Sequence, residues 1–294
     1  MYYPNLDQVK TLASEGNTIP VYCEVLADME SPVSAYQKIA YDEKGQKLPY
    51  AFLLESVEGG KNIGRYSFLG AEPLALFRQN KDHAVIEKLD GTIVEEFQGS
   101  NCFSQLSEYL KQFKQVPVDG LAPFNGGAVG FAGYESIEQI ETSVTAHPND
   151  ELKVDDAVFL ITDTLIAFDR VNHKMQVISH VNLRDGQDVE TAYAEATDKI
   201  DQILAKLNNT SIKQHLRSLP KIDDVTPASN TTKDEFYGMV KTAKDYIHEG
   251  DIIQVVLSQR FETDCTVEPL EVHRSLRSIN PSPYMFCLQL GDDF

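Results

Sequence analysis

The sequence is poor in basic residues, and this shortage limits the partners that the protein can bind. Only 26 residues are Lys or Arg, against 45 Asp and Glu, so the formal net charge is −19 at pH 7 and the sequence pI is about 4.7. A surface of this charge repels nucleic acids and anionic membranes, and neither is expected as a partner. It repels small anions as well, so a site for an anionic substrate needs positive charge close by.

Cysteines, membrane-spanning runs and targeting signals are also scarce. The four cysteines lie far apart, without a Cys-x-x-Cys pair, at Cys23, Cys102, Cys265 and Cys287. This spacing predicts reduced thiols rather than disulfides or a zinc site. No stretch is long and apolar enough to span a bilayer, and the N-terminus has no basic region followed by an apolar run. We therefore expect a cytoplasmic protein.

Two patterns that could suggest chemistry are better explained by structure. The seven histidines show no metal-ligand spacing, and His173 and His180, which flank a predicted strand, are expected to be solvated. The glycines of residues 126–133 are not followed by the Gly-Lys-Ser/Thr sequence of a phosphate-binding loop. Because they alternate with Phe131 and Tyr134, they indicate close backbone packing at a strand turn.

The rest of the chain has the composition of a globular protein, with both helical and strand signals. Hydrophobic residues make up 42% and charged residues 24% of 294 residues, enough for one large domain or two ordinary ones. Apolar spacing predicts helices over residues 31–40, 102–113, 188–207, 232–249 and 269–278. Short apolar runs predict strands over residues 50–54, 65–69, 158–168, 174–181, 251–262 and 284–290, and a hairpin within 75–97 that turns at Asp90-Gly91.

A polar segment without periodicity, residues 208–230, marks the best boundary in the chain. We predict an N-terminal region over 1–207, a linker over 208–230 and a second region over 231–294. Many hairpin signals and few strand-helix-strand crossovers predict an α+β fold of antiparallel sheets, packed as a β-sandwich with helices outside. The second region opens with a capping-box spacing at Thr232 and Glu235. It holds too few strands for a complete sheet, so the C-terminal part is predicted to be incomplete.

The run Leu53-Leu54-Glu55-Ser56 has both a structural and a functional interpretation. As structure, it is a core strand that becomes polar where it reaches the surface. As a site, a carboxylate and a hydroxyl at a strand end can hold the ammonium group of an amino acid, while the leucines form an apolar wall.

The run Asn280-Pro281-Ser282-Pro283-Tyr284-Met285 is more specific. Two prolines restrict the backbone and leave two positions without an amide donor. As structure, the run is a rigid turn that leads into a strand. As a site, the same rigidity presents backbone carbonyl groups and a wall of Tyr and Met side chains to a ligand.

These two runs and residues 250–261 together resemble the large, chorismate-using subunit of anthranilate synthase, component I. The resemblance spans nearly the whole chain, and residues from Lys61 to Tyr66 are also similar to that family. It implies that the parent protein converts chorismate and ammonia to anthranilate and pyruvate, the first committed step of tryptophan biosynthesis, under feedback inhibition by tryptophan. It further implies Mg²⁺ as a cofactor and a glutamine amidotransferase subunit, component II, as the partner that supplies ammonia.

The resemblance also assigns roles to individual residues. The tryptophan site of the family corresponds to Leu54, Glu55, Ser56, Pro283, Tyr284 and Met285. Gln254 lies on a strand that lines the active site, where relatives that add water have a lysine; a neutral amide cannot act as a base at pH 7. The family's magnesium-binding glutamates and general base are expected beyond Phe294. We therefore assign no catalytic or metal residue, and we expect the chain alone not to make anthranilate.

Two other hypotheses stay open. The large subunit of aminodeoxychorismate synthase, in the folate pathway, shares a glutamine at the position of Gln254, although residues 255–257 and the Leu-Glu-Ser run favour anthranilate synthase. A non-catalytic tryptophan-binding module is a hypothesis of a different class. The coding sequence beyond residue 294 discriminates between these hypotheses.

Overall fold

The computed structural model describes residues 1–42, 44–57, 64–99, 101–141, 143–145, 152–209 and 226–291. The chain divides into two compact units, the first formed by residues 1–212 and 269–294 and the second by residues 213–268. Lys61 lies outside the described residues. Most of the predicted linker, residues 210–225, also lies outside them, so the predicted domain limits stay predictions.

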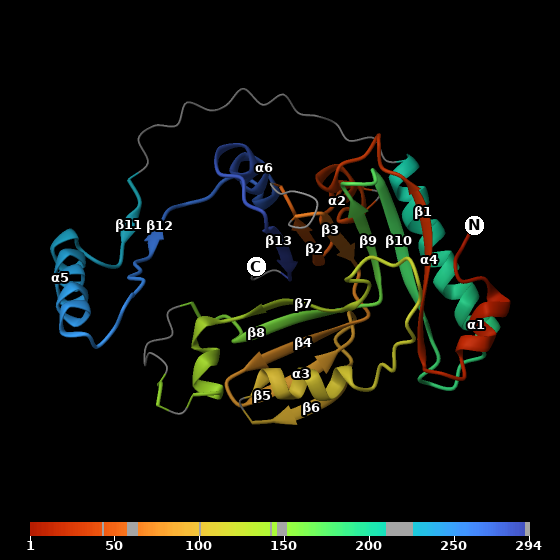
Figure 1. Ribbon diagram of the computed structural model, residues 1–294, viewed down its shortest axis with the longest axis horizontal. Helices are drawn as coiled ribbons and strands as arrows, with labels where there is room; N and C mark the ends of the chain where they lie inside the picture. The colour runs from red at the N-terminus through yellow and green to blue at the C-terminus, as the bar shows by residue number, and fades with distance from the viewer. Residues whose placement is uncertain are drawn as a thin grey trace. The chain divides into compact units, whose positions relative to one another are not determined.

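The first unit is built around two antiparallel sheets (Figure 1). The six-stranded sheet has the order β1 (Thr18–Leu26), β10 (Lys174–Asn182), β9 (Thr164–Asp169), β3 (Tyr66–Ala71), β2 (Tyr50–Glu55) and β13 (Met285–Leu290). The five-stranded sheet has the order β6 (Ile93–Gln98), β5 (His83–Glu87), β4 (Ala75–Asn80), β8 (Ala157–Thr162) and β7 (Gly127–Ala132).

Helices cover the outer faces of both sheets. The core of the six-stranded sheet's outer face includes residues of α1 (Leu6–Leu12), α2 (Pro32–Ile39), α4 (Val189–Asn209) and α6 (Pro269–Ile279). The core on the other sheet includes residues of α3 (Cys102–Leu110), and a short 3₁₀ helix, η1 (Tyr134–Gln139), follows β7. A third core lies between the sheets. The chain is thus an α+β protein with a β-sandwich between helices, as the sequence predicts.

The alternation of side chains along each strand explains how one sheet serves two cores. In β2, Ala51 and Leu53 belong to the helix-side core, and Phe52 belongs to the core between the sheets. Two local predictions are also confirmed. Ser31 caps α2 ahead of Pro32, and β5 and β6 are joined through the predicted turn at Asp90-Gly91.

One predicted strand, residues 158–168, is wrong, because the chain passes from one sheet to the other within it. β8 ends at Thr162 in the five-stranded sheet and β9 begins at Thr164 in the six-stranded sheet. Asp163 lies at this corner. Its buried carboxylate pairs with Lys199 of α4 at 2.8 Å. This ion pair compensates a buried charge that would be costly without a partner.

The second unit contains one helix, α5 (Lys233–Glu249), and a two-residue pair of strands, β11 (Ala228–Ser229) and β12 (Phe261–Glu262), among its described residues. The capping box of Thr232 and Glu235 and the left-handed Gly250 after α5 are as predicted. The strand predicted over residues 251–262 is wrong except at its end. A strand needs a hydrogen-bonded neighbour, and within the described part of this unit only β11 provides one.

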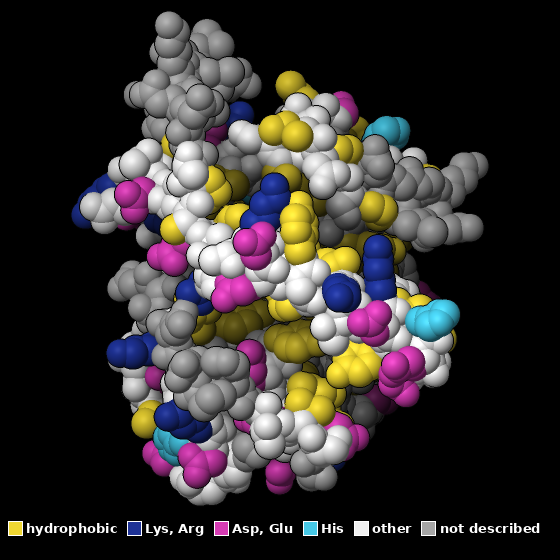
Figure 2. Space-filling view, turned by 90° about the vertical axis from the view of Figure 1, so that its left-hand side faces the viewer, with side chains coloured by type: hydrophobic (Ala, Val, Ile, Leu, Met, Phe, Trp, Pro, Cys, Tyr) yellow, Lys and Arg dark blue, Asp and Glu magenta, His cyan; other side chains and the backbone are white. Residues whose placement is uncertain are grey.

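The described surface carries charges of both signs. On the face shown in Figure 2, Lys and Arg side chains lie singly among Asp and Glu side chains. Within the described ranges, no helix combines the length and apolarity needed to cross a membrane.

Candidate ligand-binding site

The ends of β2 and β13 bring the two runs singled out from the sequence into contact. The two strands are antiparallel neighbours, with Met285 opposite Glu55 and Phe286 opposite Leu54. Just beyond the strand ends, the amide of Val57 donates a hydrogen bond to the carbonyl of Ser282 at 3.3 Å. We call this region, residues 54–57 with residues 282–285, the β2–β13 corner.

The six residues at this corner differ in exposure. Glu55, Ser56 and Met285 are buried, and Leu54 and Pro283 are partly buried. Tyr284 is 71% exposed, so its ring is available at the surface. The corner therefore offers a small exposed aromatic and apolar surface over a buried polar base.

Glu55 turns its carboxylate away from that surface and toward α6. His273 Nε2 lies 3.1 Å from Glu55 Oε2, and Arg277 Nε lies 2.7 Å from the same oxygen. The Arg277 contact is an ion pair by distance, but its Nε–H is not aligned for a hydrogen bond with any described residue. Glu55 and His273 are almost fully buried. The carboxylate therefore has its partners within the protein. These contacts hold α6 against β2, and the chain continues from α6 to Pro283.

Ser56 is held by contacts to neighbouring strands. Its hydroxyl donates to the carbonyl of Tyr66 at 2.6 Å, and its amide donates to the hydroxyl of Ser67 at 3.1 Å. The guanidinium of Arg170 donates to the carbonyls of Ser56 and Val57. Every polar group of Ser56 thus has a partner within the protein. These hydrogen bonds fix the backbone at the end of β2.

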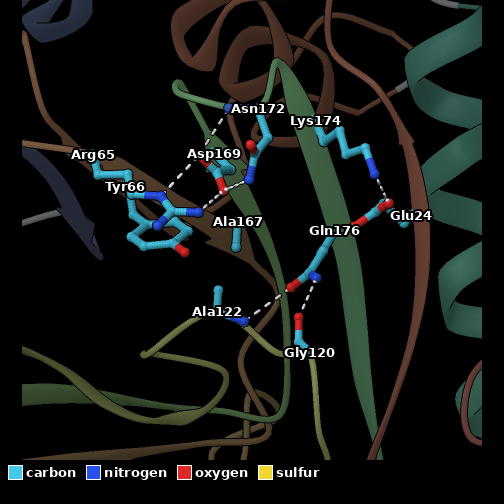
Figure 3. Close-up of a pocket in the computed structure, with 10 residues that line it drawn as sticks. All are labelled: Glu24, Arg65, Tyr66, Gly120, Ala122, Ala167, Asp169, Asn172, Lys174 and Gln176. Carbon is cyan, nitrogen blue, oxygen red and sulfur yellow. Dashed lines mark hydrogen bonds and ion pairs between the residues drawn. The ribbon is translucent and has the colours of Figure 1, made fainter. Parts of the chain in front are cut away.

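A polar cavity of about 130 Å³ is lined by Tyr66, on the neighbouring strand (Figure 3). Arg65 makes two hydrogen bonds to Asp169, which hold the pKa of that carboxyl at about 2 instead of its usual 3.8. Across the cavity, Lys174 pairs with Glu24. The four charges are therefore already compensated, and the cavity presents no free charge from these two pairs.

Comparison with known proteins decides the family. A family model described as "chorismate binding enzyme" matches residues 43–293. The chain belongs to the chorismate-binding enzyme family.

Anthranilate synthase component 1 of Acetivibrio thermocellus is 37% identical over 99% of this chain and 58% of that protein. The protein of the same name from Synechocystis is 38% identical over 99% of this chain and 57% of that protein. The crystal structure of anthranilate synthase component I from Streptococcus pneumoniae matches with a TM-score of 0.56 at 25% identity, covering 88% of this chain and 53% of that one. This chorismate-binding family member thus spans a little over half the length of the curated relatives it matches.

The remaining predicted site residue, Gln254, belongs to the second unit. It is exposed and belongs to a segment without regular secondary structure. Its predicted role at the active site stays a prediction.

The described residues do not assemble a cluster of metal-ligand side chains. In the part of this family member that the structure describes, no three His, Cys, Asp or Glu side chains converge to hold a metal ion. No step through the metal can therefore be derived for this chain.

Sequence reasoning missed His273, Arg277 and Arg170, which hold the corner together. His273 and Arg277 are four residues apart, so they share a helix face. That spacing was the available signal, but it does not reveal that the face meets Glu55, because their partner is more than two hundred residues away.

Proposed function

We propose that this chain is part of the chorismate-using subunit of an anthranilate synthase and that the β2–β13 corner belongs to its tryptophan feedback site. The observation that carries the second statement is the strand register that sets Met285 opposite Glu55. The similarity to component 1 proteins supports the first. The parent protein would convert chorismate and ammonia to anthranilate and pyruvate, with Mg²⁺ and a component II amidotransferase as cofactor and partner.

The geometry suggests how the corner would hold tryptophan. The indole would lie against Tyr284 and the apolar side chain of Leu54, and aromatic contact of this kind contributes about 0.5–1.5 kcal/mol beyond area burial. Met285 pairs with Glu55, so its side chain lies on the other face of the sheet from Leu54. Glu55 is engaged by α6, so the ligand's ammonium would instead bind backbone carbonyls of the rigid segment before Met285. Tryptophan bound there would contact both strands and favour one packing of β13 on β2. Feedback requires a ligand that binds one conformation better than the other.

The test is Ser56→Phe in the full-length parent protein. A phenyl ring cannot occupy the buried position of Ser56 without displacing Tyr66, whose carbonyl accepts a hydrogen bond from the Ser56 hydroxyl. We expect the tryptophan concentration for half-inhibition to rise about tenfold or more, with turnover in the absence of tryptophan nearly unchanged. Inhibition curves for anthranilate fluorescence measure both quantities.

Two variants control this experiment. Ser136, in η1, is as buried as Ser56, so Ser136→Phe tests whether overpacking alone reduces inhibition. Ser56→Ala removes only the hydroxyl and should shift half-inhibition less than Ser56→Phe. An unchanged half-inhibitory concentration in Ser56→Phe would refute the assignment of the corner, and an equal shift in Ser136→Phe would do so as well.

A further inference from the structure

A second cavity, of about 180 Å³, lies in the first unit at the opposite end of β9 from the β2–β13 corner. Near the corner, Asp169 at the end of β9 stands opposite Tyr66. Asp163 precedes the first residue of β9 and lines this second cavity. The cavity is thus a separate space, and neither the proposed reaction nor the proposed feedback site uses it.

The cavity wall is mostly apolar. Four hydrophobic side chains from three parts of the first unit contribute to it: Leu74, Leu110, Phe113 and Ile161. Polar side chains also line the cavity: Thr18, Gln115, Thr162, Asp163, His180 and Asn182. A mainly apolar surface interrupted by polar side chains is typical of sites for small apolar molecules that carry a polar substituent.

His180 was expected to be solvated, but it is 7% exposed. Its burial lowers the pKa of the imidazole to about 4, so the ring is neutral near pH 7. The Nε2 atom has no hydrogen-bond partner among the described residues. A buried polar atom without a partner costs about 1–3 kcal/mol, and a ligand that supplies the partner recovers that free energy.

The position of the His180 ring is set by packing. Gly126 has φ +156°, and a Cβ atom there would lie 2.1 Å from His180 Cε1. Only glycine leaves room for the ring at this place. The buried imidazole with its unpartnered Nε2 is therefore built into the fold, rather than being a side chain that could turn out to solvent.

The charges around the cavity are balanced. Asp163 is the only Asp, Glu, Lys or Arg among the described lining residues. Its carboxylate accepts hydrogen bonds from Lys199 at 2.8 Å and from Thr164 at 3.1 Å. Because burying an unpaired charge is costly, an uncharged ligand suits this cavity better than an ion.

We propose that this cavity binds an uncharged monocyclic aromatic compound with a hydroxyl group, the ring against the apolar wall and the hydroxyl on His180. A protein cavity of about 150 Å³ lined by apolar side chains holds benzene, so 180 Å³ has room for one ring and a small substituent. A hydroxyl both donates and accepts, so it can partner either neutral tautomer of His180.

Phenol and toluene are matched probes, because they have similar size and differ in the hydroxyl. Each is titrated into the 294-residue chain while the ring nitrogens of the histidines are followed by ¹⁵N NMR. We expect phenol to move the His180 signals selectively and to bind about tenfold or more tightly than toluene. No change in the His180 signals at millimolar phenol, or equal binding of the two probes, overturns the proposal.

Variants supply a second readout. His180→Phe keeps a planar ring and removes both nitrogens, so the preference for phenol over toluene should disappear. His173→Asn, on the exposed turn between β9 and β10, is the matched control and should leave that preference unchanged. A persistent phenol preference in a folded His180→Phe protein contradicts the proposal. The NMR experiment on the unmodified chain decides it if that variant does not fold.

Discussion

The Nε2 atom of His273 lies 3.1 Å from the carboxylate of Glu55, and both side chains are almost fully buried. The pair joins a helix and a strand that are far apart in the sequence. Its chemistry explains why a residue expected to face a ligand faces α6 instead, since a buried carboxylate needs compensating partners. The same pair holds α6 in place ahead of Pro283, Tyr284 and Met285.

This relationship predicts that Glu55→Gln destabilises the first unit by about 3 kcal/mol, because removing one partner of a buried ion pair leaves the others uncompensated. Urea unfolding followed by circular dichroism measures the change. Glu271→Gln is the control on the same helix, where the partner Arg274 is at the surface and the expected change is about 1 kcal/mol or less. Equal effects of the two substitutions would show that the contacts of Glu55 with His273 and Arg277 stabilise the protein no more than a surface ion pair does.

Gly130→Ala should also destabilise the protein, by about 2 kcal/mol. A Cβ atom at Gly130 would lie 1.9 Å from the carbonyl oxygen of Val158, so β7 must move away from β8. Gly238→Ala, in α5, meets no atom within 4 Å and should instead stabilise its helix by about 0.5–1 kcal/mol. If close backbone packing requires glycine at position 130, thermal unfolding shows a lower midpoint for Gly130→Ala and a higher midpoint for Gly238→Ala.

His180 predicts a loss of stability in mild acid. Its pKa is about 4 in the folded protein and near 6.5 in the unfolded chain. Between these values the unfolded chain binds the proton and the folded protein does not, so stability falls as the pH decreases from 6.5 to 4, by about 3 kcal/mol in total. Below pH 4 both states are protonated and this contribution changes no further.

The measurement is urea unfolding at several pH values for the unmodified chain and for His180→Gln. The variant should lose less stability between pH 6.5 and pH 4, because it no longer carries this group. Asp163 and Lys199, the charged groups that act on the ring, are present in both proteins. The same pH dependence in both proteins would show that His180 is not the group responsible.

Gln254→Lys in the full-length parent protein tests the predicted amination chemistry. An ammonium group would stand where relatives that add water keep a lysine, so anthranilate formation should fall and a hydroxylated product of the isochorismate type should appear. Chromatography of the products distinguishes them. Gln259→Lys, five residues further along the same segment, is a control for the added charge. Unchanged anthranilate output from Gln254→Lys would mean that Gln254 does not face the substrate.

The sequence by itself determined the features that rest on neighbouring residues. The cap at Ser31 and the capping box at Thr232 depend on partners three residues away, and the left-handed Gly250 depends on its own lack of a side chain. The antiparallel sandwich followed from the same source, because hairpins and alternating apolar residues are properties of short segments. The resemblance that led to the family likewise rested on short runs.

Tertiary structure decided which of these segments meet, and therefore what their polar residues do. Asp163 lies where the chain passes from one sheet to the other, and its buried carboxylate is compensated by Lys199 of α4. His180 is buried because Gly126 packs against its ring. Glu55 is engaged by α6 because β13 pairs with β2. Burial and charge compensation depend on contacts between distant residues, which no local pattern specifies.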